Sequence, residues 1–330
     1  MNKNTRKNPF SDIYKKCNKG NSKEKLKHLP EFPSLIDIEL TNKCNFKCLM
    51  CPTGTKMSKR KQGTMSREIF DKIATEIKQY KTPVRFSRWG EPLLHPDLIF
   101  FIQEFKKEGI LCHINTNGSL LTSDIITSFL QIPLDSIKIS FQGVTRETYT
   151  EMRNIDLFEF LLNIIKEIFE KRGSNLLPFI SASTTITYEN RDQVLQFKKQ
   201  ISPYVDDITI GRTVLEYMDV EKIKLSSDEK KTLEKLKQQE SVVKKHPECI
   251  EVFDKLSINW DGTVSACCGD FDNVMMIGDI KKDSLKSIWQ SKKMHAYRLL
   301  LSEMRHDDLP LCKTCYDYHG LETPGLQNIV

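Results

Sequence analysis

The sequence of 330 residues contains no apolar run near the ~20 residues that a membrane-spanning helix requires. Its N-terminus is rich in Lys and Asn and lacks the apolar stretch of a secretory signal, so we expect a cytoplasmic protein. No segment recurs as an internal repeat, and biased composition is limited to the N-terminal segment. These absences predict an ordinary globular protein that has no membrane as a partner.

The excess of positive charge is confined to one end of the sequence. The net charge is +6, and residues 1–30 carry nine Lys and Arg against two Asp and Glu, so residues 31–330 sum to −1. A nucleic-acid-binding body would show a basic stripe, and this sequence has none. We therefore expect residues 1–33 to be a basic, flexible leader, and we do not expect nucleic acid as a partner.

Residues 34–211 alternate short β-branched runs with helical patterns, which is typical of consecutive βα units around a parallel sheet. Between the runs, apolar residues such as Ile69, Ile73 and Ile77 recur at helical spacing. The pattern predicts an α/β fold with six strands, at Leu35–Leu40, Val84–Ser87, Leu111–Asn115, Ser136–Ser140, Ile180–Thr187 and Asp207–Ile210.

The pattern changes after the sixth strand, where residues 212–246 predict a helical connector and residues 247–330 a small second module. In that module an Asp-Gly pair at 261–262 is a strong two-residue hairpin signal. We expect a hairpin followed by helices, with the hairpin strands at Leu256–Trp260 and Thr263–Cys267.

Ten cysteines in a reducing compartment have to be explained without disulfides. Three of them, Cys44, Cys48 and Cys51, crowd onto the loop after the first predicted strand. Thiolates are the usual ligands of iron–sulfur clusters, and three on one loop can hold three corners of a cubane while the fourth iron stays open. A structural zinc ion is the alternative, but it normally takes a fourth ligand, and none is adjacent in this loop.

The spacing Cys-x3-Cys-x2-Cys on this loop, in a chain of six βα units, resembles the signature of the radical S-adenosylmethionine (SAM) superfamily. The resemblance implies a partial (β/α)6 barrel with a [4Fe-4S] cluster at Cys44, Cys48 and Cys51. In that family the amino and carboxylate groups of SAM chelate the open iron. One electron, from a flavodoxin- or ferredoxin-type donor, then cleaves SAM to a 5′-deoxyadenosyl radical. The cofactor carries this chemistry, and the protein positions and shields it.

Further motifs at the strand ends agree with this resemblance. Residues 89–92, Trp-Gly-Glu-Pro, stand where the family has Gly-Gly-Glu-Pro, a segment that binds the amino group of SAM. Asn115 begins a segment similar to the family's Thr-Asn-Gly turn, and Ser140 resembles a position on strand four that contacts SAM. The resemblance therefore implies SAM binding by Gly90, Glu91, Asn115 and Ser140. Without the resemblance, Asn115 and Ser140 could serve only as caps of their turns.

A second set of cysteines lies in the C-terminal module, at Cys249, Cys267, Cys312 and Cys315. Taken alone, four cysteines that end in Cys-x2-Cys could hold a zinc ion. Their spacing also resembles the SPASM type of extension, whose full form carries seven cysteines and two auxiliary clusters. No cysteine follows Cys315, so the resemblance implies the shorter twitch form, in which these four thiolates bind one auxiliary [4Fe-4S] cluster.

The auxiliary cluster bears on the reaction. A cluster with four protein ligands has no open iron for substrate, and its simplest use is to accept an electron, which favours oxidation of the substrate radical. The cysteine spacing is similar to that of the radical SAM dehydrogenase that oxidises 2-deoxy-scyllo-inosamine, which implies a carbohydrate or aminocyclitol alcohol as substrate. Oxidation also needs a group that takes the hydroxyl proton. Arg212, just past the sixth strand, is the candidate; the alternative is an exposed arginine at a strand end.

Three other functions stay open. An epimerase of a sugar or peptide would need a hydrogen-atom donor, for which Cys268 or Cys112 could serve. A peptide-modifying SPASM enzyme often has a peptide-binding domain ahead of the barrel, and the leader, which contains Cys17, is too short for one. The candidate from another class is a non-catalytic metal-binding scaffold that binds nucleic acid through its basic leader.

Overall fold

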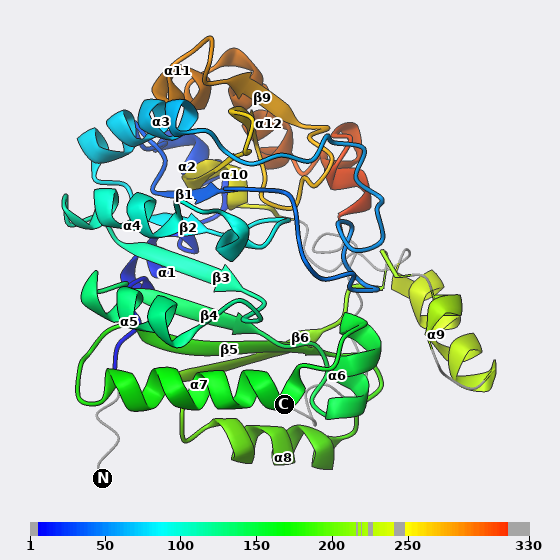
Figure 1. The fold of residues 1–330 in the computed structure, drawn as a ribbon. Coiled ribbons are helices and arrows are strands. Elements are labelled where there is room, and N and C mark those ends of the chain that lie inside the picture. The colour runs from blue at the N-terminus through cyan, green and yellow to red at the C-terminus, as the bar shows by residue number, and fades with distance from the viewer. Residues whose placement is uncertain (1–5, 216, 219, 224–226, 241–247, 316–330) are drawn as a thin grey trace.

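The computed structural model describes residues 6–215, 217–218, 220–223, 227–240 and 248–315. Within them, one sheet contains β1 (Leu35–Ile38), β2 (Val84–Phe86), β3 (Cys112–Thr116), β4 (Ser136–Ser140), β5 (Phe179–Ile186), β6 (Asp207–Arg212), β7 (Lys255–Ile258), β8 (Thr263–Ser265) and β9 (Met276–Asp279). The strand order is β6-β5-β4-β3-β2-β1-β7-β8-β9, and β1 to β6 are mutually parallel (Figure 1).

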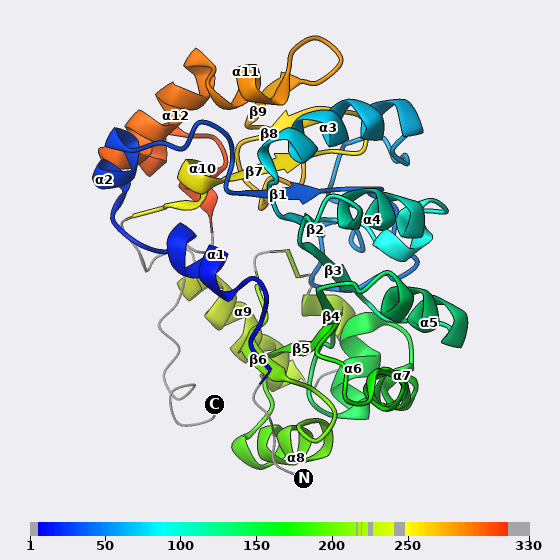
Figure 2. The ribbon, with the colours of Figure 1, turned by 90° about the vertical axis from the view of Figure 1, so that its left-hand side faces the viewer.

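One face of the sheet, called here the outer face, is covered by the helices that follow the parallel strands (Figures 1 and 2). The helices are α3 (Arg67–Tyr80), α4 (Leu98–Lys106), α5 (Ser123–Gln131), α6 (Arg146–Arg153), α7 (Phe158–Arg172) and α8 (Arg191–Ile201). Strand residues on this face, such as Ile36, Ile114 and Ile180, are fully buried in the main core. The α/β fold that the alternation predicts is therefore confirmed.

The opposite face, called here the inner face, is polar. Side chains alternate between the two faces of a strand, so the neighbours of the buried isoleucines point inward. The register places Asp37 opposite Arg85, Arg85 opposite His113, and Lys138 opposite both Asn115 and Ser181. The interior of the barrel is thus lined by charged and hydroxyl side chains.

The predicted C-terminal hairpin is present, and it extends the barrel sheet. Its first strand, β7, pairs parallel to β1, with Leu256 opposite Ile36, and β8 and β9 continue the sheet antiparallel. The turn places Gly262 at φ +87°, a conformation that favours glycine. The connector contains α9 (Ser227–Glu240), and residues 241–247 and 316–330 lie outside the described part of the chain.

The N-terminal segment departs from the expected flexible leader, which is wrong for residues 6–33. The segment forms α1 (Ser11–Cys17) and α2 (Ser22–Lys27). Phe10 is fully buried and its ring lies 5.8 Å from the ring of His113, while Arg85 lies 5.9 Å from the ring of Tyr14. Figure 2 shows α1 in front of the N-terminal ends of the strands. Phe10 and Tyr14 lie four residues apart, so their side chains share one helix face. The net charge of the segment does not reveal this face.

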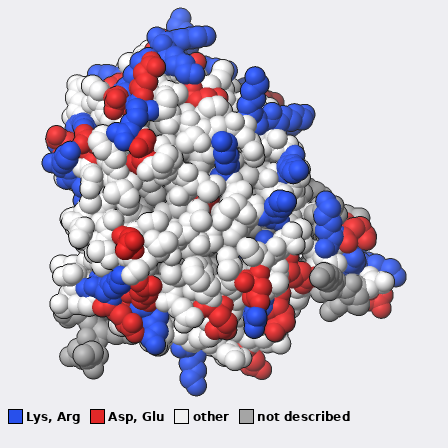
Figure 3. Space-filling view, in the orientation of Figure 1, with Lys and Arg blue, Asp and Glu red and all other residues white. Residues whose placement is uncertain are grey.

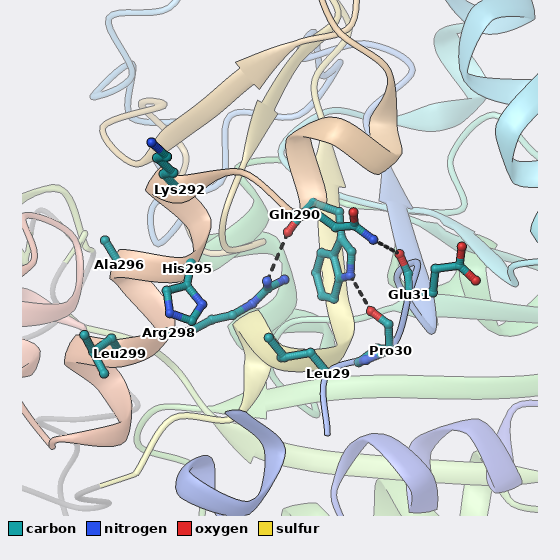
Figure 4. Close-up of a pocket in the computed structure, with 10 residues that line it drawn as sticks. Leu29, Pro30, Glu31, Gln290, Lys292, His295, Ala296, Arg298 and Leu299 are labelled. Carbon is teal, nitrogen blue, oxygen red and sulfur yellow. Dashed lines mark hydrogen bonds between the residues drawn. The ribbon is translucent and has the colours of Figure 1, made fainter. Parts of the chain in front are cut away.

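The C-terminal helices hold the segment that leads into β1. The Nε1 of Trp289, at the end of α11 (Leu285–Trp289), donates to the carbonyl of Pro30 at 2.8 Å, and Gln290 donates to that of Glu31 at 3.0 Å. Arg298, on α12 (Lys292–Ser302), packs 3.9 Å from the Trp289 ring and donates to its carbonyl (Figure 4). The strand that precedes the first cysteine loop is therefore anchored by the C-terminal module.

Charged side chains on the face in Figure 3 are of both signs and do not merge into one basic stripe. None of the helices in the described ranges combines the length and the apolar character needed to cross a bilayer.

We predict that Phe10→Ala lowers the free energy of unfolding by about 3 kcal/mol, because it removes a fully buried ring. Urea denaturation followed by circular dichroism measures the loss. Phe160→Ala, which truncates a 38% exposed ring on α7, should cost less than about 1 kcal/mol. Equally small losses in both variants would show that the N-terminal segment does not dock in solution.

Candidate active site

The first cysteine loop leaves the C-terminal end of β1 and returns to α3. Cys48 is buried at 5% exposure, and the next residue, Leu49, donates its N–H to the carbonyl of Met152 at 3.0 Å. Burial raises the pKa of Cys44 to about 11, and the nearby charges of Cys48 and Cys51 contribute to the shift. The three predicted cluster ligands therefore lie close together, in a place where a bare thiol keeps its proton.

Two glycines let the backbone fold around these cysteines. A Cβ on Gly54 would meet the carbonyl oxygen of Cys48 at 2.4 Å, so this end of the loop can close only without a side chain. A Cβ on Gly90 would meet the carbonyl oxygen of Thr41 at 1.9 Å. Gly90 is thus required by the close approach of the loop after β1, whatever it contacts in a cofactor.

Glu91 is a structural anchor. Its buried carboxylate accepts from the hydroxyl of Thr116 at 2.6 Å and from the N–H groups of Asn117 at 2.8 Å and Leu93 at 3.1 Å. Its own N–H donates to the carbonyl of Lys43 at 2.9 Å. Burial raises the pKa of Glu91, and these hydrogen bonds oppose the shift. The carboxylate therefore ties the end of β3 to the loops after β1 and β2.

The turn after β3 brings Asn117 to the cysteines, and Asn115 lies elsewhere. The side-chain nitrogen of Asn117 lies 3.8 Å from the sulfur of Cys44 and donates to Asn45 at 2.9 Å. Asn115 lies on the inner face opposite Lys138, and its Oδ1 is buried with no hydrogen-bond partner in the described part of the chain. Asn117 belongs to the turn that the sequence points to, but it lies further along the chain than the asparagine that the resemblance implies.

Arg153, which the sequence does not single out, joins the cysteine loop to β4. Its Nη1 donates to the sulfur of Cys48 at 3.4 Å, and its Nη2 donates to the carbonyls of Ser140 at 2.6 Å and Phe141 at 3.1 Å. The predicted residue Ser140 therefore meets this network through its backbone. An arginine in the last turn of a helix has no sequence signal that separates this role from a surface charge.

The four C-terminal cysteines lie near one another. Burial raises the pKa of Cys312 to about 12, and the charges of Cys249 and Cys315 add to the shift. A hydrogen bond with Cys268 raises the pKa of Cys267, and Cys249 adds to it. No three His, Cys, Asp or Glu side chains of the described residues surround one point as the ligands of a single ion would. A cubane needs no such point, because each thiolate binds a different iron.

The loop after Cys267 packs directly on the loop after β2. The ring of Trp89 meets the ring of Phe271 edge to face at 5.8 Å, and Nη2 of Arg88 donates to the carbonyl of Asp270 at 2.8 Å. The carboxylate of Asp270 accepts from the N–H of Met275 at 2.8 Å, which holds this loop in shape. The tryptophan that replaces the first glycine of the family's pattern thus contacts the C-terminal module.

The remaining predicted residues lie in different surroundings. Cys268 is close enough to Asp37 and Arg85 for their charges to act on its pKa, which the hydrogen bond with Cys267 lowers. Cys112 is fully buried in the main core, on the same outer face of β3 as Ile114. Arg212 pairs with Ile186, whose side chain is buried in the same core, so the register favours the outer face for Arg212.

Two family models match the chain. The model of the radical SAM superfamily matches residues 38–201, and the SPASM model, an iron–sulfur cluster-binding domain, matches residues 249–316. The chain belongs to the radical SAM superfamily and carries a SPASM domain. The cofactors predicted from the sequence, SAM and iron–sulfur clusters, are those of these two domains. The residues fit them, because the two sets of thiols are gathered and Gly54 and Gly90 leave room for the loops around the first.

Curated relatives match part of the length of this chain. The uncharacterised protein MJ0804 of Methanocaldococcus jannaschii is 32% identical over 178 residues, which are 54% of this chain and 56% of that protein. The chain spans about half the length of the curated relatives it matches.

Solved structures show the same fold. BtrN in complex with AdoMet and 2-DOIA, the 2-deoxy-scyllo-inosamine dehydrogenase, has a TM-score of 0.55 at 18% identity and covers 86% of this chain and 93% of that chain. SuiB of Streptococcus suis bound to S-adenosylmethionine has a TM-score of 0.62 at 16% identity and covers 83% of this chain and 70% of that chain. At these identities the likeness shows the fold alone.

We predict that Gly90→Ala lowers the iron bound by the first cysteine loop, because the added methyl group would displace the backbone at Thr41. Iron analysis and visible absorbance after anaerobic reconstitution measure the loss, which should be about half of the total iron. Gly109→Ala is the control, because a Cβ there meets nothing within 4 Å, although its φ of +69° costs some stability. Full iron content in Gly90→Ala would contradict the close approach.

We predict that Arg153→Met shifts the reduction potential of the first cluster by on the order of 50 mV to more negative values, because a positive charge beside Cys48 stabilises the reduced state. An electron paramagnetic resonance redox titration measures it. Arg146→Met, on the same helix but ion-paired with Asp156, should leave the potential unchanged. A shift of the same size in both variants would rule out the contact with Cys48 as its cause.

Proposed function

We propose that this radical SAM enzyme dehydrogenates an alcohol of a small, hydroxylated substrate, a carbohydrate or an aminocyclitol. In this proposal Cys44, Cys48 and Cys51 hold the SAM-binding cluster. The four cysteines of the C-terminal module hold one auxiliary [4Fe-4S] cluster, which takes the electron of the substrate radical.

The observation that carries the proposal is the gathering of Cys249, Cys267, Cys312 and Cys315 in the module that packs on the loop after β2. Four thiols can ligate all four irons of a cubane, which leaves no iron for substrate and favours electron transfer as its use. The loop after Cys267 contacts the loop after β2 through Trp89 and Phe271. The electron acceptor would therefore sit against the segment that borders the SAM site.

The inner face of the barrel supports a hydroxylated substrate. On β5 the residues on this face are small and carry hydroxyl groups, at Ser181, Ser183 and Thr185, and the register sets Ser140 opposite Ser183. Such a lining offers many donors and acceptors to a polyol and little apolar surface to a lipid. SAM, when bound, supplies the radical, while this lining would orient the carbon to be oxidised.

The chain's own residues would position SAM and the substrate and shield them from water. Glu91 fixes the turn that presents Asn117 beside Cys44, and Arg153 fixes the end of β4 beside Cys48. The N-terminal helix α1 covers the opposite end of the barrel, where Phe10 packs on His113. At this end α1 would help to keep water away from a radical intermediate.

An epimerase is the second candidate, and Cys268 favours it. This cysteine lies near Asp37 and Arg85 of the inner face, where a thiol could return a hydrogen atom to a substrate radical. A peptide substrate is the third candidate, since SuiB is also known bound to its precursor peptide SuiA. For each candidate we propose a flavodoxin- or ferredoxin-type electron donor and a cytoplasmic location.

We predict that the reconstituted, reduced enzyme cleaves SAM to 5′-deoxyadenosine without oxygen, and that a carbon-deuterated aminocyclitol alcohol passes its deuterium into that product. One ketone should form per deoxyadenosine. Mass spectrometry of both products measures this. The assignment as a radical SAM enzyme is rejected if SAM stays intact while the clusters are loaded and reduced.

Cys268→Ala separates the two reactions. In this variant a dehydrogenase should still form its ketone product. An epimerase that uses Cys268 should no longer incorporate hydrogen from solvent into its product. Cys112→Ala is the matched control, because that thiol is fully buried in the main core on the outer face of the sheet. A wild-type product that carries a solvent-derived hydrogen instead of a ketone, and that is lost in Cys268→Ala alone, would overturn the dehydrogenase assignment.

A further inference from the structure

Lys138 is a basic side chain of the inner face that has no role in the proposed function above. It lies in the middle of β4, two residues before Ser140, with Asn115 opposite on β3 and Ser181 opposite on β5. Within the ranges that the structure describes, Lys138 makes no hydrogen bond and no ion pair. A half-buried lysine without a partner is uncommon, because desolvation of the ammonium is then not offset.

The neighbouring charges of the inner face are already paired. Arg85 forms two hydrogen bonds with Asp37, at 2.6 and 2.8 Å. Higher in the barrel, Glu39 accepts from Arg60 at 2.5 and 3.2 Å and lies 3.8 Å from Arg88.

The other titratable groups around Lys138 do not offset its charge. Burial lowers the pKa of Lys138, Arg85 lowers it further, and Asp207, across β5, opposes the shift. Burial also holds the pKa of His113 well below its usual value, so this imidazole is neutral. Lys138 is therefore held toward its neutral form, in which its nitrogen can accept a proton.

Asn115 supplies the complementary group. Its Oδ1 is buried and has no partner in the described residues, and it lies on the strand next to Lys138, about 4.8 Å away at the backbone. The two side chains together offer an amine and a carbonyl oxygen. A hydroxyl group fits between them, because it can accept from the amine while it donates its one proton to Oδ1 of Asn115, and it can rotate to donate that proton to the amine when the proton is transferred. An anion would suit only a protonated Lys138, and its oxygens could not donate a hydrogen bond to the Oδ1 of Asn115.

We propose that Lys138 and Asn115 hold the reacting hydroxyl of the substrate, and that Lys138 takes its proton during oxidation. The inference rests on the proposed dehydrogenase function. The carbon gives its hydrogen atom to the deoxyadenosyl radical. The resulting ketyl radical gives one electron to the auxiliary cluster and its hydroxyl proton to the neutral amine, so the carbonyl forms and Lys138 becomes an ammonium. Lys138 replaces Arg212 in this role.

The kinetic test uses Lys138→Met and Lys138→Arg with the alcohol that the enzyme oxidises. Both variants should lower kcat by about 100-fold, because neither side chain can accept a proton at the working pH. The wild-type rate should rise with pH through the pKa of Lys138, and both variants should lose this limb. Rescue by Lys138→Arg would show that only a positive charge is needed and would overturn the proton transfer. Lys106→Met, which breaks an ion pair with Asp135, is the matched control.

A second test needs no turnover. Lys138 of the cluster-loaded enzyme is acetylated with a neutral reagent, and peptide mass spectrometry follows the rate over pH. The acetylation of Lys138 should reach half its maximal rate at a lower pH than the acetylation of free N-acetyl-lysine amide does. With SAM present, myo-inositol should slow this acetylation more than inorganic phosphate at the same concentration. Stronger protection by phosphate, or none by inositol, would overturn the hydroxyl site.

The two tests separate this inference from the function on which it rests. Protection by inositol without oxidation of any alcohol would leave the hydroxyl site standing and reject the dehydrogenase. Normal oxidation by Lys138→Met would reject the role of Lys138 and leave the dehydrogenase standing.

Discussion

Strand β1 is hydrogen-bonded on both of its edges, and the arrangement of the molecule depends on this pairing. Ile36 lies opposite Val84 of β2 on one side and opposite Leu256 of β7 on the other. The first cysteine loop starts where β1 ends, and the hairpin that begins with β7 leads to Cys267. Four residues of extended chain therefore fix the two cysteine sets relative to one another.

Around that strand, buried polar groups hold the loops in place. Glu91 fastens the end of β3, Arg153 fastens the end of β4, and Asp270 fastens the loop after Cys267. Each is buried or partly buried with its charge met by hydrogen bonds, so loss of one partner costs more than the bond itself contributes. Trp89, in contact with Phe271, joins the loop after β2 to the C-terminal module. The two domains thus meet at this loop.

Local sequence patterns predict most of the fold and the cysteine sets. The strand at Ser136–Ser140 agrees residue for residue, and the other five parallel strands differ by two residues or fewer at each end, because β-branched runs and turn residues act locally. The pairing of β7 with β1 and the docking of Phe10 escape such patterns, since contacts between distant segments leave no local signal. Asn117 and Arg153 escape them for the same reason, and Lys138 stands out only once the register shows that its neighbours are paired.

Two separate cubane clusters in one chain set its iron content, which iron analysis after anaerobic reconstitution measures. The reconstituted chain should bind about eight irons, and the triple variant with Cys44, Cys48 and Cys51 changed to Ala should keep about four, with the absorbance and magnetic signature of one [4Fe-4S] cluster. Loss of all iron in that variant, or a wild-type chain with only about four, would contradict the two-site arrangement.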